Sequence, residues 1–272
     1  MKRYELDKYK EDIINLYVYE KLSCSKIAEI MNCSLCGIYD ALKRWKIKTR
    51  SLRDSHLIYS VNESYFCEID TEEKAYWLGF IYADGYITGN KLGISLANID
   101  KTHLEKFKKC IDSDHEIKSY ISNSVYGTCE YCRILINSKK VVEDIKNKGV
   151  INNKSLKLKF PSNRILDRNL YKHFIRGYFD GDGSLVLSKS SINFKFCGTK
   201  EFLEALVDVF NSISSYKYKK RLYKRRNDDK NNYYISYGGR MKTLNIMDYL
   251  YNNCNIYLER KYKKYERLKS TL

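Results

Sequence analysis

The feature that most constrains how this chain can fold is a nine-residue motif that occurs twice. Residues 77–85 read WLGFIYADG and residues 175–183 read IRGYFDGDG, so that Asp84 and Asp182 stand 98 residues apart. Each copy is followed by an alternating strand pattern, a helical pattern, a stretch of two further strands and another helix. Such a repeat at domain spacing predicts two α+β halves, residues 70–165 and 166–272, related by a pseudo-twofold axis.

Each predicted motif helix carries a glycine in its middle, Gly79 in the first copy and Gly177 in the second. A glycine there costs about 1 kcal/mol of helix propensity relative to alanine, so it needs a structural reason. Close packing of one helix backbone on the other supplies that reason. The last motif residues, Gly85 and Gly183, suit the left-handed conformation that often ends a helix.

This arrangement places Asp84 and Asp182 at the carboxyl ends of two adjacent helices. The helix dipole disfavours a carboxylate at that end. Two neighbouring carboxylates also repel each other unless a cation lies between them. Oxygen ligands of this kind favour a hard divalent cation such as Mg²⁺, so the pattern predicts a metal site at the end of the helix pair.

At these residues the chain resembles the LAGLIDADG homing endonucleases, of the single-chain kind with two motif copies, and the resemblance covers residues 70–272. It implies an α+β fold in which a pseudo-twofold pair of αββαββα halves forms a DNA-binding saddle. It also implies site-specific hydrolysis of both strands of a long, asymmetric double-stranded DNA site with Mg²⁺ or Mn²⁺ as cofactor. Enzymes of this family are typical of introns and other mobile elements.

The resemblance also implies which residues act. The eighth motif position is the family's metal-binding catalytic acid, and backbone carbonyls at the seventh position add metal contacts. A basic residue near the end of each half completes the family's site, and residues 153–155 and 258–261 resemble those two segments. The expected catalytic residues are Asp84, Asp182, Lys154 and Lys261, with Lys157, Lys159 and Arg260 as alternatives to the lysines, and the expected metal ligands are Asp84, Asp182, Ala83 and Gly181. Asp180 stands at the sixth motif position, where the first half has Tyr82, and is expected to be structural.

Residues 217–226 contain seven cations and no acid, followed by a turn-like segment at 227–232 and a strand pattern at 233–237. This pattern predicts a basic β-hairpin, which has the dimensions to lie in a DNA major groove. The alternative is an edge strand protected by charge. The first half's counterpart, residues 118–133, is less charged, so we expect the two half-sites to be bound unequally. The predicted DNA contacts are Lys217, Lys219, Arg221, Tyr223 and Arg225.

Residues 1–50 predict a small all-α module with three short helices between residues 8 and 48. Its pattern resembles a helix-turn-helix, with Asn32 in the turn and Ser34 as the N-cap of the third helix. That helix would enter a major groove. The alternative is a three-helix bundle with no particular role, and residues 51–69 are expected to be a linker. The predicted DNA contacts are Tyr39, Lys43, Arg44, Lys46, Lys48 and Arg50.

The composition agrees with a nucleic-acid partner. The 272 residues carry 50 Lys and Arg against 33 Asp and Glu, a formal net charge of +17. No apolar run is long enough to span a membrane and no signal segment opens the chain, so we expect a cytoplasmic protein of a prokaryotic host or phage that is not secreted. The nine cysteines are expected to be thiols, and the two CxxC pairs lie too far apart to predict a zinc site. We expect a monomer without a small-molecule substrate.

Two other functions remain compatible with this sequence. A DNA-binding transcriptional regulator can share this fold without cleaving, although the presence of both Asp84 and Asp182 favours an enzyme. An intron maturase of the same family would bind RNA through the same basic, aromatic-rich segments. A nucleotide-dependent kinase or transferase is disfavoured because neither GxxxxGK[ST] nor GxGxxG occurs.

Overall fold

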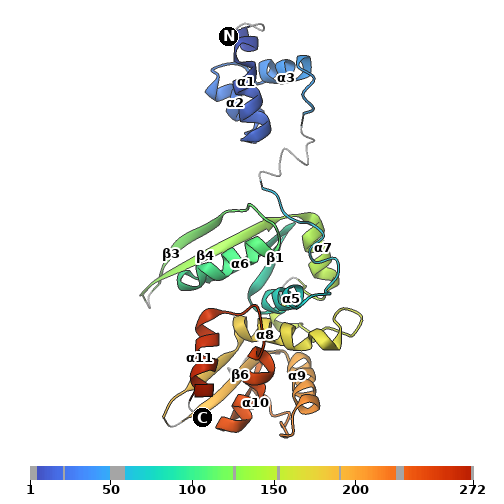
Figure 1. Ribbon diagram of the computed structural model, residues 1–272, viewed down its shortest axis with the longest axis vertical. Coiled ribbons are helices and arrows are strands. Elements are labelled where there is room, and N and C mark those ends of the chain that lie inside the picture. The colour runs from blue at the N-terminus through green and yellow to red at the C-terminus, as the bar shows by residue number, and fades with distance from the viewer. Residues whose placement is uncertain are drawn as a thin grey trace. The chain divides into compact units, whose positions relative to one another are not determined.

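The computed structural model describes residues 5–20, 22–49, 59–124, 127–151, 154–189, 191–224 and 230–270. They belong to two compact units, residues 1–60 and 61–272, each with its own buried core (Figure 1). Tyr65, Phe66 and Ile69 are buried in the core of the second unit. Residues 61–69 are therefore part of that unit, and not of the linker expected at 51–69.

The first unit is helical throughout its described elements. They are η1 (Glu5–Tyr9), α1 (Lys10–Ile14), the π-helical turn η2 (Asn15–Tyr19), α2 (Cys24–Ile30) and α3 (Leu35–Arg44). The hydroxyl of Ser34 accepts a hydrogen bond from the backbone N–H of Gly37 at 3.1 Å, which confirms the predicted N-cap of α3. Asn32 adopts a φ of 49° between α2 and α3, as the turn requires. The inner faces of α1, α2 and α3 carry the fully buried residues Ile13, Ile27 and Ile38.

The second unit contains two halves that share the order αββαββα, which confirms the predicted fold, and the second half ends with one more helix, α11. The first half comprises α5 (Glu72–Asp84), β1 (Gly85–Thr88), β2 (Lys91–Ala97), η3 (Asn98–Asp100), α6 (Lys101–Cys110), β3 (Ile117–Ser124), β4 (Gly127–Asn137) and α7 (Lys139–Asn147). The second comprises α8 (Tyr171–Asp182), β5 (Ser184–Leu187), β6 (Ile192–Gly198), α9 (Lys200–Ile213), β7 (Tyr223–Lys224), β8 (Tyr233–Gly238), α10 (Arg240–Tyr251) and α11 (Glu259–Ser270). The short turns η4 (Lys154–Leu156) and η5 (Arg168–Leu170) lie between them.

Each half folds into a four-stranded antiparallel sheet with the same strand order, β1-β2-β4-β3 and β5-β6-β8-β7. Helices α6 and α7 pack on one face of the first sheet, and α9 and α10 pack on one face of the second (Figure 1). In β4 the alternate residues Cys132, Ile134 and Ile136 are buried under the helices. The residues between them, such as Tyr131 and Arg133, therefore lie on the opposite face, which we call the open face.

The basic segment differs from its prediction. Among the described residues of this segment only Tyr223 and Lys224 pair with β8, so residues 217–222 do not form a hairpin strand. Tyr218 is buried, and the side chain of Asn211 bonds both its backbone N–H, at 2.7 Å, and its carbonyl, at 3.0 Å. At Tyr218 this side chain takes the place of a neighbouring strand, although the Tyr218 ring still packs against Phe194 and Tyr237 of the sheet.

None of the helices described is both long enough and apolar enough to span a membrane.

Candidate active site and nucleic-acid interface

The two motif helices cross with their backbones in contact. A Cβ atom built on Gly79 would overlap the carbonyl oxygen of Phe174, and one built on Gly177 would overlap the carbonyl oxygen of Tyr76. These reciprocal contacts show why both motifs need a glycine in mid-helix, and they place α5 and α8 about a pseudo-twofold axis (Figure 1).

The terminal glycines have a different role from the predicted one. Gly85 has a φ of −71° and Gly183 a φ of −79°, so both are extended, and the left-handed expectation was wrong. A Cβ on Gly85 would come within 2.7 Å of the carbonyl oxygen of Ile81, and one on Gly183 within 2.6 Å of the carbonyl oxygen of Phe179. The first strand of each half leaves its helix so sharply that only glycine fits.

Asp84 and Asp182 end α5 and α8, as predicted from the motif. Oδ2 of Asp84 lies beside the last turn of α8, where a Cβ on Gly181 would approach it to 3.2 Å. Burial and then the negative charge of Asp182 raise the pKa of Asp84 to about 6, although Lys261 and Lys154 act in the opposite direction. The two carboxylates are therefore close enough to interact electrostatically.

One lysine caps the carboxyl end of each motif helix. Nζ of Lys154 donates to the carbonyl oxygens of Tyr82, at 2.7 Å, and of Ala83. Nζ of the buried Lys261 donates to the carbonyl oxygens of Phe179, Gly181 at 3.3 Å and Gly183 at 2.7 Å. An ammonium at this end satisfies carbonyls that the helix leaves unpaired and offsets the helix dipole.

Burial affects both lysines. It lowers the pKa of Lys261 to about 8, against the opposing effect of Asp180. Burial also lowers the pKa of Lys154, against the opposing effects of Asp182 and Asp84. The alternatives lie elsewhere: Lys157 and Lys159 are exposed, and Arg260 donates to Asp100 at 2.8 Å. Of these five basic residues, Lys154 and Lys261 are the ones whose side chains bond the carboxyl ends of the motif helices.

The donor set at this place fits a hard divalent cation. Its oxygens come from the carboxylates of Asp84 and Asp182 and from the carbonyls of Ala83 and Gly181, each of which has a second lone pair beside its lysine. Across the described ranges, no group of three or more His, Cys, Asp or Glu side chains could hold a metal. Mg²⁺ suits a site with two carboxylates, because it usually keeps several waters and also binds substrate phosphates.

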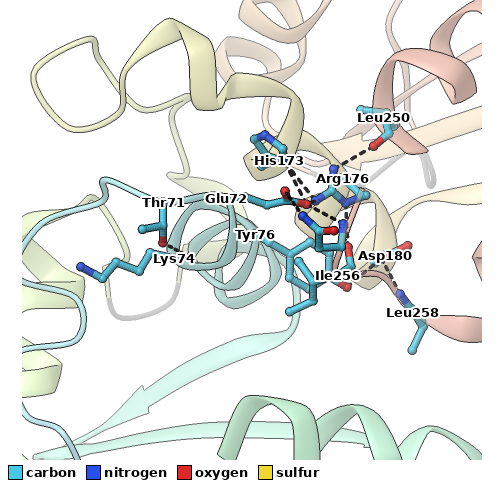
Figure 2. A network of polar contacts seen from close by, with 11 residues as sticks. Thr71, Glu72, Lys74, Tyr76, His173, Arg176, Asp180, Leu250, Ile256 and Leu258 are labelled. Atoms are coloured by element: carbon cyan, nitrogen blue, oxygen red, sulfur yellow. Dashed lines mark hydrogen bonds and ion pairs between the residues drawn. The ribbon is translucent and has the colours of Figure 1, made fainter. Parts of the chain in front are cut away.

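Asp180 is buried and accepts three hydrogen bonds, which agrees with a structural role. The hydroxyl of Tyr76 donates at 2.7 Å and the backbone N–H of Leu258 at 2.8 Å (Figure 2). The hydroxyl of Tyr251 is the third donor. Burial raises the pKa of Asp180, and the charge of Lys261 opposes this effect. Tyr82 at the corresponding position donates to the carbonyl of Lys148. Tyr82 therefore contacts the chain just after α7, and Asp180 contacts the last residue of α10 and the chain that follows it.

The open faces carry an aromatic pair that the sequence patterns did not reveal. On the first sheet Tyr120 and Tyr131 stack at 5.2 Å between ring centroids, and the guanidinium of Arg133 lies 4.6 Å from the Tyr120 ring. One signal for this pair was available in the sequence: Tyr131 and Arg133 alternate with the buried residues of β4.

The second sheet repeats this arrangement. Tyr223 and Tyr234 stack at 5.3 Å, and Nζ of Lys195 lies 4.4 Å from the Tyr234 ring. Each half thus presents flat aromatic surface beside a cation on its open face, where bases and phosphates could be contacted.

The other predicted DNA contacts are spread over both units. Lys217, Lys219, Arg221 and Tyr223 are exposed, as are Tyr39, Lys43, Lys46 and Lys48 of the first unit. Arg44 instead donates to Asp7 at 2.8 Å, and the indole N–H of Trp45 shares the same oxygen. Arg50 and Arg225 lie outside the described residues.

Comparison with known proteins identifies the family. The model of the LAGLIDADG-like domain matches residues 71–148 and 169–262, which include both motif copies and Lys261. This chain belongs to the LAGLIDADG-like domain family. The match ends before most of α11 and does not include the first unit.

Individual relatives of this LAGLIDADG protein are more distant. The replication factor C small subunit of Methanocaldococcus jannaschii is 30% identical over 173 residues, which make up 60% of this chain but only 9% of that protein. The solved structure of the homing endonuclease I-WcaI bound to its DNA recognition sequence covers 74% of this chain and 90% of that chain, with 18% identity and a TM-score of 0.51. Full-length WhiA from Thermatoga maritima covers 77% of this chain and 64% of that chain, with 13% identity and a TM-score of 0.48.

Proposed function

We propose that this LAGLIDADG protein is a divalent-metal-dependent endonuclease that hydrolyses both strands of a long, asymmetric double-stranded DNA site. The observation that carries the proposal is the meeting of Asp84 and Asp182, one carboxylate from each motif copy, at the ends of two helices in backbone contact. The negative charge of Asp182 acts on the pKa of Asp84, so a cation between them would relieve their repulsion.

The chain supplies the ligands and the positive charge around them. Asp84 and Asp182 would hold Mg²⁺ or Mn²⁺, with the carbonyls of Ala83 and Gly181 as further ligands. Bound there, the cation would stabilise charge on the attacking and leaving oxygens of a phosphodiester. Lys154 and Lys261 hold the carbonyl ends of the motif helices in place, and their charge favours the approach of a phosphate.

The two open faces provide the duplex-binding surface of this proposal. The tyrosine pairs with Arg133 and Lys195 lie on the open faces of the two sheets, and the second half adds the exposed cations of residues 217–221. Unequal halves favour an asymmetric site. The first unit, with the exposed Tyr39 and Lys43 on α3, would bind DNA beside that site and add avidity.

The test is cleavage of a plasmid library that carries randomised target sites, in the presence of Mg²⁺, with sequencing of all cut ends. The parent is expected to cut at one long site, and the Asp84→Asn and Asp182→Asn variants are expected to lose cleavage. Asp208→Asn is the matched control, because Asp208 is an exposed carboxylate that pairs with Lys220 on the surface. It should cut like the parent.

Cleavage that survives both aspartate substitutions would refute the assigned site. If no site is cut but the library still yields a tightly bound sequence, the endonuclease proposal fails and a non-cleaving regulator takes its place. Selective binding of structured RNA without DNA cleavage would instead indicate a maturase.

A further inference from the structure

A polar network around the buried guanidinium of Arg176 joins the start of the first motif helix to the end of the second half (Figure 2). Glu72, the first residue of α5, accepts hydrogen bonds from Arg176 Nη2 at 2.7 Å and from the backbone N–H of Asn255 at 2.9 Å. Its other oxygen accepts from the side-chain amide of Asn255 at 3.0 Å. A first-half carboxylate thus holds a residue that lies between the last two helices of the second half.

Arg176 binds the same stretch of chain from the other side. Its Nε donates to the carbonyl of Ile256 and its Nη1 to the carbonyl of Leu250, each at 2.8 Å. The side chain is fully buried on α8, so these contacts have to be made for the guanidinium to be tolerated there. Together Glu72 and Arg176 bind the backbone at Leu250, in the last turn of α10, and at Asn255 and Ile256, between α10 and α11.

The stretch held in this way leads directly to Lys261. Two residues after Ile256, the N–H of Leu258 donates to Asp180 at 2.8 Å, and the carbonyl of Leu258 accepts from the backbone N–H of Lys261 at 2.9 Å. Lys261 is the third residue of α11, and its Nζ reaches back to Phe179 and Gly183. The path of the chain from Leu250 to Leu258 therefore helps to set the position of Lys261, together with the bond from Arg260 to Asp100 beside it.

The network has no equivalent in the sequence of the other half. At the motif offset of 98 residues, Glu72 corresponds to Leu170 and Arg176 to Leu78. The segment after Lys154 contacts different second-half groups: the carbonyl of Leu158 accepts from the Thr199 hydroxyl, and the carbonyl of Leu156 accepts from the amide of Asn231. The two lysines are thus held by different means, although both depend on the opposite half.

We propose that Glu72 is a positioning residue that acts across the interface between the halves: a side chain of the first half sets the place of Lys261 in the second. This inference rests on the proposed endonuclease function and adds an asymmetry to it. Loss of the Glu72 contacts impairs cleavage of the strand served by Lys261, and it leaves the strand served by Lys154 unaffected.

The experiment uses Glu72→Gln in the full chain. Glutamine keeps the size of the side chain, but its NH₂ group cannot accept the hydrogen bonds that the second carboxylate oxygen accepts. The matched control is Glu105→Gln, which makes the same charge change at an exposed residue of α6. Single-turnover cleavage is followed on a target duplex with a different fluorophore on each strand, and Lys261→Met and Lys154→Met mark which strand depends on which lysine.

Glu72→Gln is expected to lower the cleavage rate of the DNA strand whose cleavage depends on Lys261 by about tenfold to a hundredfold. A small misplacement of a group at a reacting centre has an effect of this size. The cleavage rate of the other strand and the Kd for DNA in Ca²⁺ stay within twofold of the parent values. Glu105→Gln changes the cleavage rate of neither strand. The inference is overturned if the cleavage rates of both strands fall equally, if only the strand that depends on Lys154 is cut more slowly, or if neither rate changes.

A second measurement does not depend on cleavage. Hydrogen exchange should be faster in Glu72→Gln for a peptide spanning residues 255–262, and unchanged for a peptide spanning residues 154–166. Unchanged exchange at 255–262 overturns the positioning role even if the parent cleaves. If the parent cuts no DNA but exchange rises at 255–262 only, the endonuclease function has failed while Glu72 still positions Lys261.

Discussion

Replacement of Asp84 by asparagine is expected to stabilise the folded protein at neutral pH when metal is absent. The carboxylate of Asp84 is ionised at pH 7.5, half-buried, at a helix carboxyl end and near Asp182, all of which disfavour its charge. Asparagine has nearly the same shape and carries no charge. Asp84, which would serve a metal site, therefore lowers the stability of the metal-free protein.

The magnitude follows from the pKa of Asp84, which burial and the charge of Asp182 raise from the ordinary 3.8 to about 6. Between these two values the folded state binds the proton and the unfolded state does not, so the free energy of unfolding falls as the pH rises. Above pH 6 the full difference applies, about 3 kcal/mol at about 1.4 kcal/mol for each pKa difference of one. At pH 4.5 the same relation leaves about 1 kcal/mol.

The assay is urea unfolding in EDTA at pH 7.5 and pH 4.5 for the parent, Asp84→Asn and the surface control Asp208→Asn. Asp84→Asn should exceed the parent by about 3 kcal/mol at pH 7.5 and by about 1 kcal/mol at pH 4.5. The reasoning is refuted if Asp84→Asn is no more stable than the parent at pH 7.5, or if the gap does not narrow on acidification. Asp208→Asn should show no pH-dependent gap of this size.

Two further predictions concern the helix crossing and the open face. Gly79→Ala places a methyl group against the carbonyl of Phe174, so urea unfolding should show a loss of about 1–3 kcal/mol despite the gain in helix propensity, and an unchanged stability would contradict the close crossing. Arg133→Ala should weaken binding of the target duplex by about 1–3 kcal/mol and relax base preference at one position of the site, as measured by fluorescence anisotropy in Ca²⁺ on a panel of single-base variants. Equal weakening on every variant of the panel would show that Arg133 contacts phosphate and does not read a base.

Much of the fold and of the candidate site could be predicted from the repeat. A glycine in mid-helix, an aspartate at the helix end and a strand pattern after it are local features, and their recurrence after 98 residues made two equivalent halves the simplest arrangement. Gly85 and Gly183 were correctly predicted to follow the motif helices, but the predicted reason, a left-handed conformation, was wrong. Their φ values are ordinary, and the requirement for glycine comes from contact with the preceding turn, which a one-dimensional pattern does not contain.

Other features could not be predicted because their partners are remote in sequence. The basic run at 217–222 has the composition of a strand, but the side chain of Asn211 takes the backbone hydrogen bonds of Tyr218 in its middle. Residues 61–69 lack periodicity, yet Phe66 is fully buried against the rest of the second unit. In both cases the decisive contact depends on packing that only the folded chain provides.

The sequence by itself determined that two motif helices exist, that they cross at Gly79 and Gly177, and that Asp84 and Asp182 end them, because each of these properties is encoded in neighbouring residues. The family resemblance pointed to Lys154 and Lys261 among several candidates, and the tertiary structure decided that these two lie at the ends of the motif helices and what holds them there. Lys261 lies 79 residues after Asp182, and Glu72, which holds the stretch before it, lies 189 residues before Lys261. Contacts at such separations depend on how the two halves pack, since packing of buried surfaces determines which distant residues meet.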